Sequence, residues 1–188
     1  VMSSTGPHFC GGIDISMFGS DAPANPHGKR QRGLKFLDTV KRMQDSLSVL
    51  EQCRLPVLVA IQGGCIGGGV DLATAADMRY ATADAFVTIY ETKIGMTADV
   101  GTFPRIVKLI PEGIVRELAY TGRRMPAAEA LNVGLVNRVF DDHEAMLDGV
   151  MDVTCTHRTP RHAARHPPAC VHAHMLTNSV TRPSESTE

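Results

Sequence analysis

Apolar side chains recur every three or four residues between positions 29 and 54, which predicts one long amphipathic helix. Pro56 would stop this helix, because proline cannot continue an α-helix. The next apolar run, PVLVAIQG at residues 56–63, is β-branched and bordered by Pro and Gly, which predicts a buried strand. The apolar positions that would share one face of the long helix are Leu34, Leu37, Val40, Met43, Leu47, Leu50 and Cys53.

The chain then alternates between short strands and helices. Two strands are expected at residues 78–82 and 85–89, linked by a tight turn at Ala83–Asp84, and a third at residues 135–140. Helices are expected at residues 70–77, from Thr102 to an end at Gly122, at residues 126–134 and, with an N-terminal cap, at residues 141–153.

Composition limits the classes of protein that fit this pattern. A chain of 188 residues with a net charge of -1 is long enough for one domain and carries no basic stripe for nucleic acid or an anionic membrane. No run of eighteen apolar residues predicts a membrane span. The five cysteines are an odd number without a C-x-x-C pair, which argues against a disulfide framework and a zinc site.

The composition changes after Thr154. Of the 8 histidines and 11 prolines, a large share lies beyond this residue, and no Phe or Tyr follows Phe140. Such a segment buries little apolar surface, so we expect a core at residues 1–154 and a disordered or non-family tail at residues 155–188. Two histidine pairs in the tail, His162 with His166 and His172 with His174, lack acidic partners, and we expect no metal site there.

A glycine-rich run, GGCIGGG at residues 63–69, follows the predicted strand. It lacks the Lys-Ser or Lys-Thr of a P-loop and the spacing of a dinucleotide-binding loop. Glycines let the backbone approach a ligand with its amides turned inward at a helix N-terminus, which is the design of an oxyanion site. A second segment, HFCGGIDIS at residues 8–16, could supply another amide. The alternatives are a tight turn that binds nothing for the first run and a hairpin or bulge for the second.

Three stretches together resemble the enoyl-CoA hydratase/isomerase (crotonase) superfamily: FCGGIDIS, PVLVAIQGGCIGGGVDLATAADMRYAT and ETKIGMTADVGT. The resemblance implies an α/β fold, a crotonase-like spiral of strand-strand-helix repeats, incomplete at both ends. It also implies that the amides of Ile13 and Gly68 form an oxyanion hole for an acyl-CoA thioester. The substrate-binding residues would be Gly11, Gly12, Ile13, Asp14, Ile15 and Gly68.

The acids of the site select among reactions of the superfamily. Asp71, Glu91 and Asp99 together resemble the delta(3,5)-delta(2,4)-dienoyl-CoA isomerases of unsaturated fatty-acid β-oxidation, whereas hydratases have Glu for Asp71 and a small residue for Asp99. The resemblance implies that Asp99 removes the proton nearer the thioester and Glu91 protonates the far end. Asp71 would orient by hydrogen bonding. In an apolar pocket, two carboxyl groups favour one protonated and one ionised form, as a proton shuttle requires.

Two other functions fit the same sequence. One is another acyl-CoA activity of the superfamily, above all hydration of a 2-enoyl-CoA, which Asp99 disfavours because it fills space that a hydratase leaves open. The other is a truncated, inactive crotonase-like protein that acts only through association.

The resemblance also sets expectations for cofactors, partners and location. We expect no metal, flavin or nicotinamide, because CoA enters as part of the substrate. A homo-oligomer, trimer or hexamer, is implied, as is a mitochondrial or peroxisomal location. Any targeting peptide would precede Val1.

Overall fold

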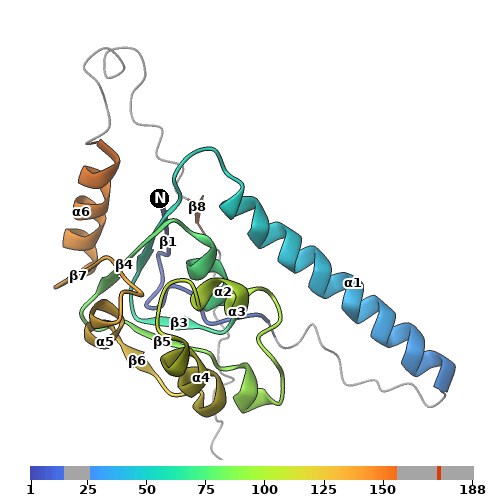
Figure 1. Ribbon diagram of the computed structural model, residues 1–188. Coiled ribbons are helices and arrows are strands. Elements are labelled where there is room, and N and C mark those ends of the chain that lie inside the picture. The colour runs from blue at the N-terminus through green and yellow to red at the C-terminus, as the bar shows by residue number, and fades with distance from the viewer. Residues whose placement is uncertain (15–25, 156–172, 175–188) are drawn as a thin grey trace, which may run out of the picture.

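Two β-sheets form the centre of the fold, which the computed structural model describes for residues 1–14, 26–155 and 173–174. The larger sheet is parallel throughout, with strand order β7-β4-β2-β1-β8 (Figure 1). Its strands are β1 (Met2–Ser3), β2 (Leu58–Ile61), β4 (Met78–Thr82), β7 (Arg138–Phe140) and β8 (Ala173–His174). The smaller sheet has the order β3-β5-β6, formed by β3 (Gly64–Ile66), β5 (Phe86–Thr88) and β6 (Met125–Pro126).

Helices follow the strands along the chain. They are α1 (Pro26–Glu51), α2 (Gly68–Ala75), α3 (Thr102–Ile106), α4 (Glu112–Thr121), α5 (Ala127–Asn132) and α6 (His143–Cys155), with a short 3-10 helix, η2, at Glu91–Ile94. None of the helices that the structure describes is long and apolar enough to cross a membrane.

The chain winds as a spiral that visits the two sheets in turn. In one coil, β2 of the larger sheet leads to β3 of the smaller sheet and then to α2; in the next, β4 leads to β5 and then to η2, α3 and α4. The coil that precedes these two has the same pattern. In it, β1 is followed by Cys10, which pairs in parallel with Cys65 of β3, and then by α1. This is the predicted α/β spiral of strand-strand-helix repeats.

Alternate residues of the central strand β2 face two different cores. Leu58 and Ala60 pack with Met146 and Val150 of α6, which covers one face of the larger sheet (Figure 1). The residues that alternate with these two, Val59 and Ile61, belong to the main core on the other face. Because side chains alternate between the faces of a strand, a strand buried on both faces is apolar throughout.

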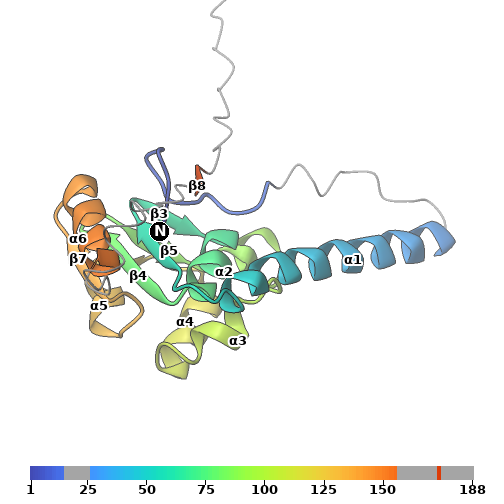
Figure 2. The same cartoon turned by 90° about the horizontal axis from the view of Figure 1, so that it is seen from above.

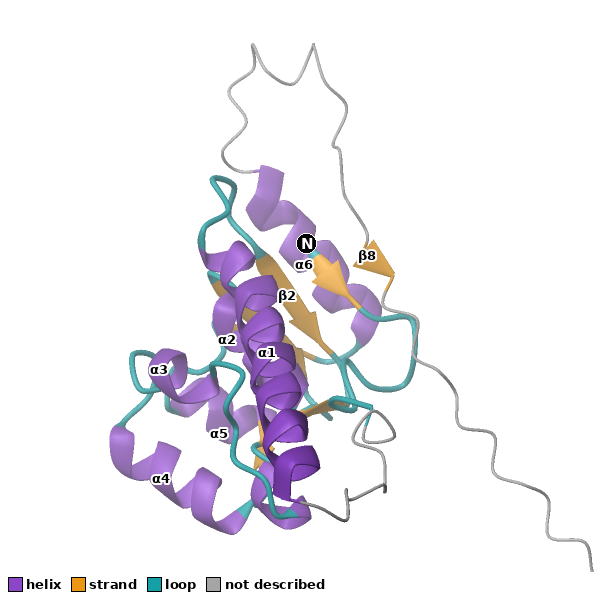
Figure 3. Ribbon diagram, turned by 90° about the vertical axis from the view of Figure 1, so that its right-hand side faces the viewer, coloured by secondary structure: helices purple, strands orange, loops and turns teal. Residues whose placement is uncertain are grey.

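Among the described side chains of the long helix α1, those that pack against the main core lie in its C-terminal half. Val40 is 5% exposed and Leu47 and Leu50 pack against the main core, but Leu34 and Leu37 are 55% and 47% exposed. Figures 1 and 2 show the N-terminal half of α1 extending beyond the sheets, and in Figure 3, which views the protein from that side, α1 lies in front of them. The helix was predicted at residues 29–54 with its apolar residues on one face. In the structure it spans Pro26–Glu51, and Leu34 and Leu37 at the N-terminal end of that face are exposed.

Arg79 fixes the junction of β4 with its neighbours. Its side chain is buried and donates hydrogen bonds to the carbonyl oxygen of Ala76 at 2.6 Å, at the C-terminal end of α2, and to that of Leu135 at 2.7 Å. Burial lowers the pKa of this guanidinium. The carbonyls that end α2 therefore obtain donors from a side chain rather than from water.

The predicted turn at Ala83–Asp84 joins two different sheets in the structure. The turn is present, but β4 and β5 on either side of it lie in different sheets. The chain therefore changes sheets at this turn. The glycine run also contains a strand of its own, β3, which pairs in parallel with β5.

Most of the predicted tail lies outside the described residues, as do Ile15, His162, His166 and His172. The part of residues 155–188 that is described comprises Cys155, the last residue of α6, and β8, which pairs in parallel with β1. The rest of the tail remains a prediction.

Candidate active site

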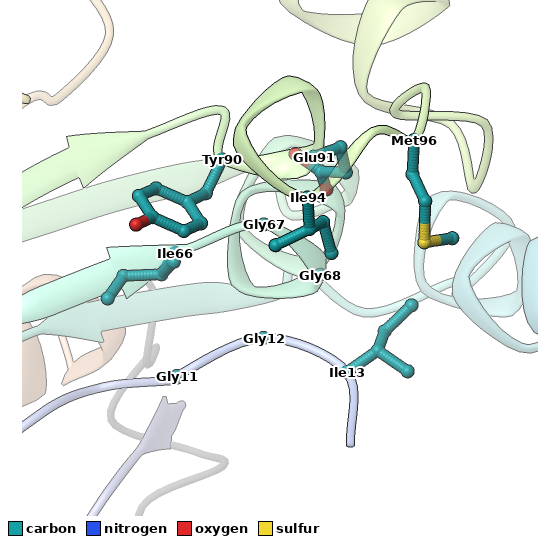
Figure 4. Close-up of a pocket in the computed structure, with 10 residues that line it drawn as sticks. All are labelled: Gly11, Gly12, Ile13, Ile66, Gly67, Gly68, Tyr90, Glu91, Ile94 and Met96. Carbon is teal, nitrogen blue, oxygen red and sulfur yellow. The ribbon is translucent and has the colours of Figure 1, made fainter. Parts of the chain in front are cut away.

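A cavity of about 270 Å³ opens where three coils of the spiral leave the smaller sheet (Figure 4). Its walls come from the loop after Cys10, the junction of β3 with α2, and the segment from Tyr90 through η2. The lining residues are Gly11, Gly12, Ile13, Ile66, Gly67, Gly68, Tyr90, Glu91, Ile94 and Met96. Apart from Glu91, these residues offer backbone or largely apolar side chains to a ligand.

Strand register brings these three segments together. Cys10 pairs with Cys65, and Cys65 pairs with Val87, so the three residues lie level across parallel neighbours. Three residues further along each segment stand Ile13, Gly68 and Tyr90, all at the cavity. Since parallel segments leave a sheet at the same edge, residues distant in sequence meet there.

Glycine is required where the segments touch most closely. A Cβ added at Gly68 would lie 3.0 Å from Cγ1 of Ile13 and 3.5 Å from its backbone nitrogen. Gly67 has φ +52°, and a Cβ there would lie 3.2 Å from Oε1 of Glu91. The backbones of Ile13 and Gly68 therefore lie side by side, with the carboxyl group of Glu91 against the same glycine turn.

The amides predicted to bind an oxyanion sit in this contact. Gly68 is the first residue of α2, where a backbone amide has no intrahelical acceptor. The neighbouring Gly67 amide is different, since it donates to the carbonyl oxygen of Thr88 at 3.0 Å. Within the described residues, no backbone carbonyl accepts a hydrogen bond from the Ile13 amide, which stands beside Gly68.

Glu91 is the carboxyl group that lines the cavity. It is the first residue of η2, and its Oε2 is buried without a hydrogen-bond partner among the described residues. Burial raises the pKa of Glu91, backbone hydrogen bonds at Glu91 and Tyr90 oppose that rise, and the charges of Asp71 and Asp99 add to it. The side chain is therefore suited to carry a proton and to release it in the cavity.

Asp71 is fully buried in the first turn of α2 and does not line the cavity. Its Oδ1 accepts hydrogen bonds from both the backbone amide and the hydroxyl of Thr102, each at 2.7 Å. Burial raises the pKa of Asp71, while the Thr102 hydrogen bonds and the charge of Arg105 oppose that rise. These contacts suit an orienting residue better than one that meets a substrate.

The remaining predicted residues lie around this centre. Asp99 is half-buried and is not part of the cavity lining, although its charge raises the pKa of both Asp71 and Glu91. Its carbonyl oxygen accepts a hydrogen bond from Nε2 of Gln44. Asp14 is exposed and does not line the cavity, and Ile15 is outside the described residues.

Sequence reasoning missed the apolar wall and the supports of Asp71. Tyr90, Ile94 and Met96 flank Glu91 in the cavity, and their apolar character next to an isolated acid was a usable signal. Thr102 and Arg105 gave no such signal, because a Thr and an Arg at a helix start have many ordinary roles. No group of three or more His, Cys, Asp or Glu in the part of the chain described here could hold a metal ion.

Comparison with known proteins identifies the family of the chain. The family described as enoyl-CoA hydratase/isomerase matches residues 1–187. The human mitochondrial delta(3,5)-delta(2,4)-dienoyl-CoA isomerase is 46% identical over 154 residues, which cover 80% of this chain and 47% of that protein. The peroxisomal enzyme of the same name from Arabidopsis thaliana is 40% identical over 157 residues, 81% of this chain and 56% of that protein. The chain thus spans about half the length of the curated relatives it matches.

Solved structures give the same result for the fold. A putative enoyl-CoA hydratase from Thermobifida fusca, in complex with acetoacetyl-CoA, superposes with a TM-score of 0.70 at 26% identity, covering 82% of this chain and 62% of that one. The enoyl-CoA hydratase from Thermoplasma volcanium superposes with a TM-score of 0.70 at 31% identity, covering 83% and 58%. By sequence and by fold, the chain belongs to the enoyl-CoA hydratase/isomerase family.

Proposed function

We propose that this protein converts 3,5-dienoyl-CoA to 2,4-dienoyl-CoA in the β-oxidation of unsaturated fatty acids. The observation that carries the proposal is Glu91, which lines an apolar cavity beside the paired glycine loops and has one buried carboxyl oxygen without a hydrogen-bond partner among the described residues. The identity of 40% and 46% with isomerases of this name supports the choice of substrate.

In the proposed reaction, the amides of Ile13 and Gly68 bind the thioester oxygen and stabilise the negative charge that develops on it. Asp99 removes a proton from C2, and the electron pair spreads over the conjugated carbons to C6. Glu91 then donates its proton to C6, so that the double bonds shift to C2 and C4 without net gain or loss of atoms. Asp99 ends protonated and Glu91 ionised, and proton exchange resets them.

The charges around Glu91 favour this division of roles. Burial and the neighbouring carboxylates Asp71 and Asp99 raise the pKa of Glu91, which favours its protonated form when the other acids are ionised. An acid that is protonated at the start of the cycle can act as the donor. Asp71, held by Thr102, serves as the orienting group.

No separate cofactor is required by this chemistry, because CoA arrives as part of the substrate. We also propose a homo-oligomer, a trimer or hexamer, which family membership and the exposed apolar residues of α1 support. A mitochondrial or peroxisomal location is in keeping with the names of the human and Arabidopsis relatives.

The test is a spectrophotometric assay with 3,5-dienoyl-CoA, since the 2,4-dienoyl product is conjugated with the thioester and absorbs where the substrate does not. Asp99→Asn and Glu91→Gln should each lower kcat by about 100-fold or more. Asp84→Asn, at an exposed turn, is the matched control and should leave kcat unchanged.

Two outcomes would reject the proposal. Turnover of 2-enoyl-CoA by hydration, without isomerisation of the dienoyl substrate, would establish the hydratase alternative. Absence of both activities in a chain that sediments as a monomer or an aggregate would support the inactive alternative. Retention of the wild-type rate by Asp99→Asn would remove Asp99 from its proposed role.

A further inference from the structure

Three polar side chains of α1 face the segment that carries Asp99. Gln44, Ser48 and Glu51 are spaced by four and three residues, so they lie on one face of the helix. Gln44 donates to the carbonyl oxygen of Asp99, while Ser48 and Glu51 both contact Arg105 of α3. The C-terminal half of α1 therefore contacts both ends of the segment from Asp99 to Arg105.

Arg105 is the centre of these contacts. Its side chain is 8% exposed, and Nη2 lies 2.9 Å from the Glu51 carboxylate and 3.2 Å from the Ser48 hydroxyl. A buried guanidinium without a partner would be costly, so these two acceptors hold the side chain in one position. Glu51 itself is 42% exposed and can be changed without opening the core.

The guanidinium also lies directly against the backbone that follows Asp99. Nη1 is 3.4 Å from the carbonyl oxygen of Val100. Gly101 has φ +125°, and a Cβ at this position would collide with the guanidinium nitrogen and carbon atoms of Arg105. The absence of a side chain at Gly101 lets the flat cation pack on the backbone of residues 100–101, at the start of α3.

The charge of Arg105 acts on the second acid of the site as well. It lowers the pKa of Asp71, against the larger effect of burial. One side chain thus contacts the backbone next to Asp99 and acts through space on Asp71.

We propose that Arg105, anchored by Ser48 and Glu51 of α1, is a positioning residue that fixes the Asp99 backbone for proton abstraction. The expected effect on kcat rests on the proposed isomerase function. The expected effect on the structure of the 99–105 segment rests on the contacts alone. The guanidinium is required as well as the positive charge, because it contacts α1 and the backbone before α3 at the same time.

The experiment compares Arg105→Gln, Arg105→Lys and Glu51→Gln with the wild type. Arg105→Gln should lower kcat about 10- to 100-fold while KM changes less than about threefold, because a misplaced base slows chemistry more than binding. Arg105→Lys should recover part of the loss, and Glu51→Gln should show a smaller fall in kcat. The matched control is Arg116→Gln, which removes an exposed Arg that pairs with Glu112 at the surface of α4.

Hydrogen-deuterium exchange gives a readout that does not depend on activity. Residues 99–106 should exchange about tenfold faster in Arg105→Gln and Glu51→Gln than in the wild type, with α6 unchanged. If the wild type lacks isomerase activity, the proposed function fails and exchange still decides whether Arg105 fixes this segment. Unchanged exchange there, or a loss that falls on KM alone, would overturn the proposal.

Discussion

Replacement of Thr102 by Val tests how Asp71 is held. Valine matches the shape of threonine, so the change removes the hydroxyl donor to Oδ1 of Asp71 and leaves the backbone donor at 2.7 Å in place. A hydrogen bond to an ionised group contributes about 1.5 to 3 kcal/mol, roughly twice the value of a neutral one. The variant should therefore be less stable by about 2 kcal/mol when Asp71 is ionised and by about 1 kcal/mol when it is protonated.

The loss should depend on pH in a defined direction. Because burial raises the pKa of Asp71 above 3.8, the folded state keeps this proton to a higher pH than the unfolded state does. The contribution of Asp71 to the stability of the folded state therefore falls as pH rises from 3.8 through the folded pKa. Without the hydroxyl donor the folded pKa rises further, so the deficit of the variant should grow with pH.

Thermal unfolding between about pH 4.5 and pH 8.5 measures this difference, and about 2 kcal/mol corresponds to about 4 to 8 °C in Tm for a chain of this size. Thr102→Ser keeps the hydroxyl and loses one buried methyl group, so its deficit should be about 1 kcal/mol at every pH. If Thr102→Val showed the same deficit at both ends of the range, the hydroxyl would not be stabilising an ionised Asp71.

Three further changes test other parts of the structure. Gly67→Ala should lower kcat about tenfold, because an Ala at positive φ is strained and its Cβ meets the facing carboxylate, whereas Gly113→Ala, which meets nothing within 4 Å, should not; equal rates would contradict the close approach. Arg79→Met should lower the free energy of unfolding in urea by about 3 kcal/mol, since buried carbonyls lose their donors, and a loss below about 1 kcal/mol would refute this. Iodoacetamide should label the exposed Cys53 in the folded protein and Cys65 only after denaturation, because Cys65 is buried and burial raises the pKa of its thiol; peptide mass spectrometry would reveal early labelling of Cys65 as a contrary result.

The local parts of the site could be predicted from the sequence because their signals are contiguous. The glycine run indicates a close backbone approach, and the structure places Gly68 against Ile13. Glu91 was found through its motif and lines the cavity. Arg105 could not be found in this way, since its role depends on contacts with Ser48 and Glu51, more than fifty residues away in the chain.

The fold shows the same limit. Strand β2 was predictable because four consecutive buried residues leave a strong apolar signal. The strands β1 and β6 have two residues each, too few for any pattern to appear. Periodicity also overestimated the packing of α1, because an apolar face shows that a helix can be buried but not how much of it meets the core.

In the proposed mechanism, thioester binding and proton transfer fall on different parts of the sequence, because the chain alternates between two sheets. Ile13 and Gly68, which are proposed to bind the thioester oxygen, belong to the first two coils of the spiral, whereas Glu91 and Asp99 belong to the third. If the proposed mechanism holds, substitutions in that third coil would change which carbon gains or loses a proton and leave the thioester-binding amides in place. This separation would let one fold host several reactions of one substrate class, because the binding residues can stay the same while the acids differ.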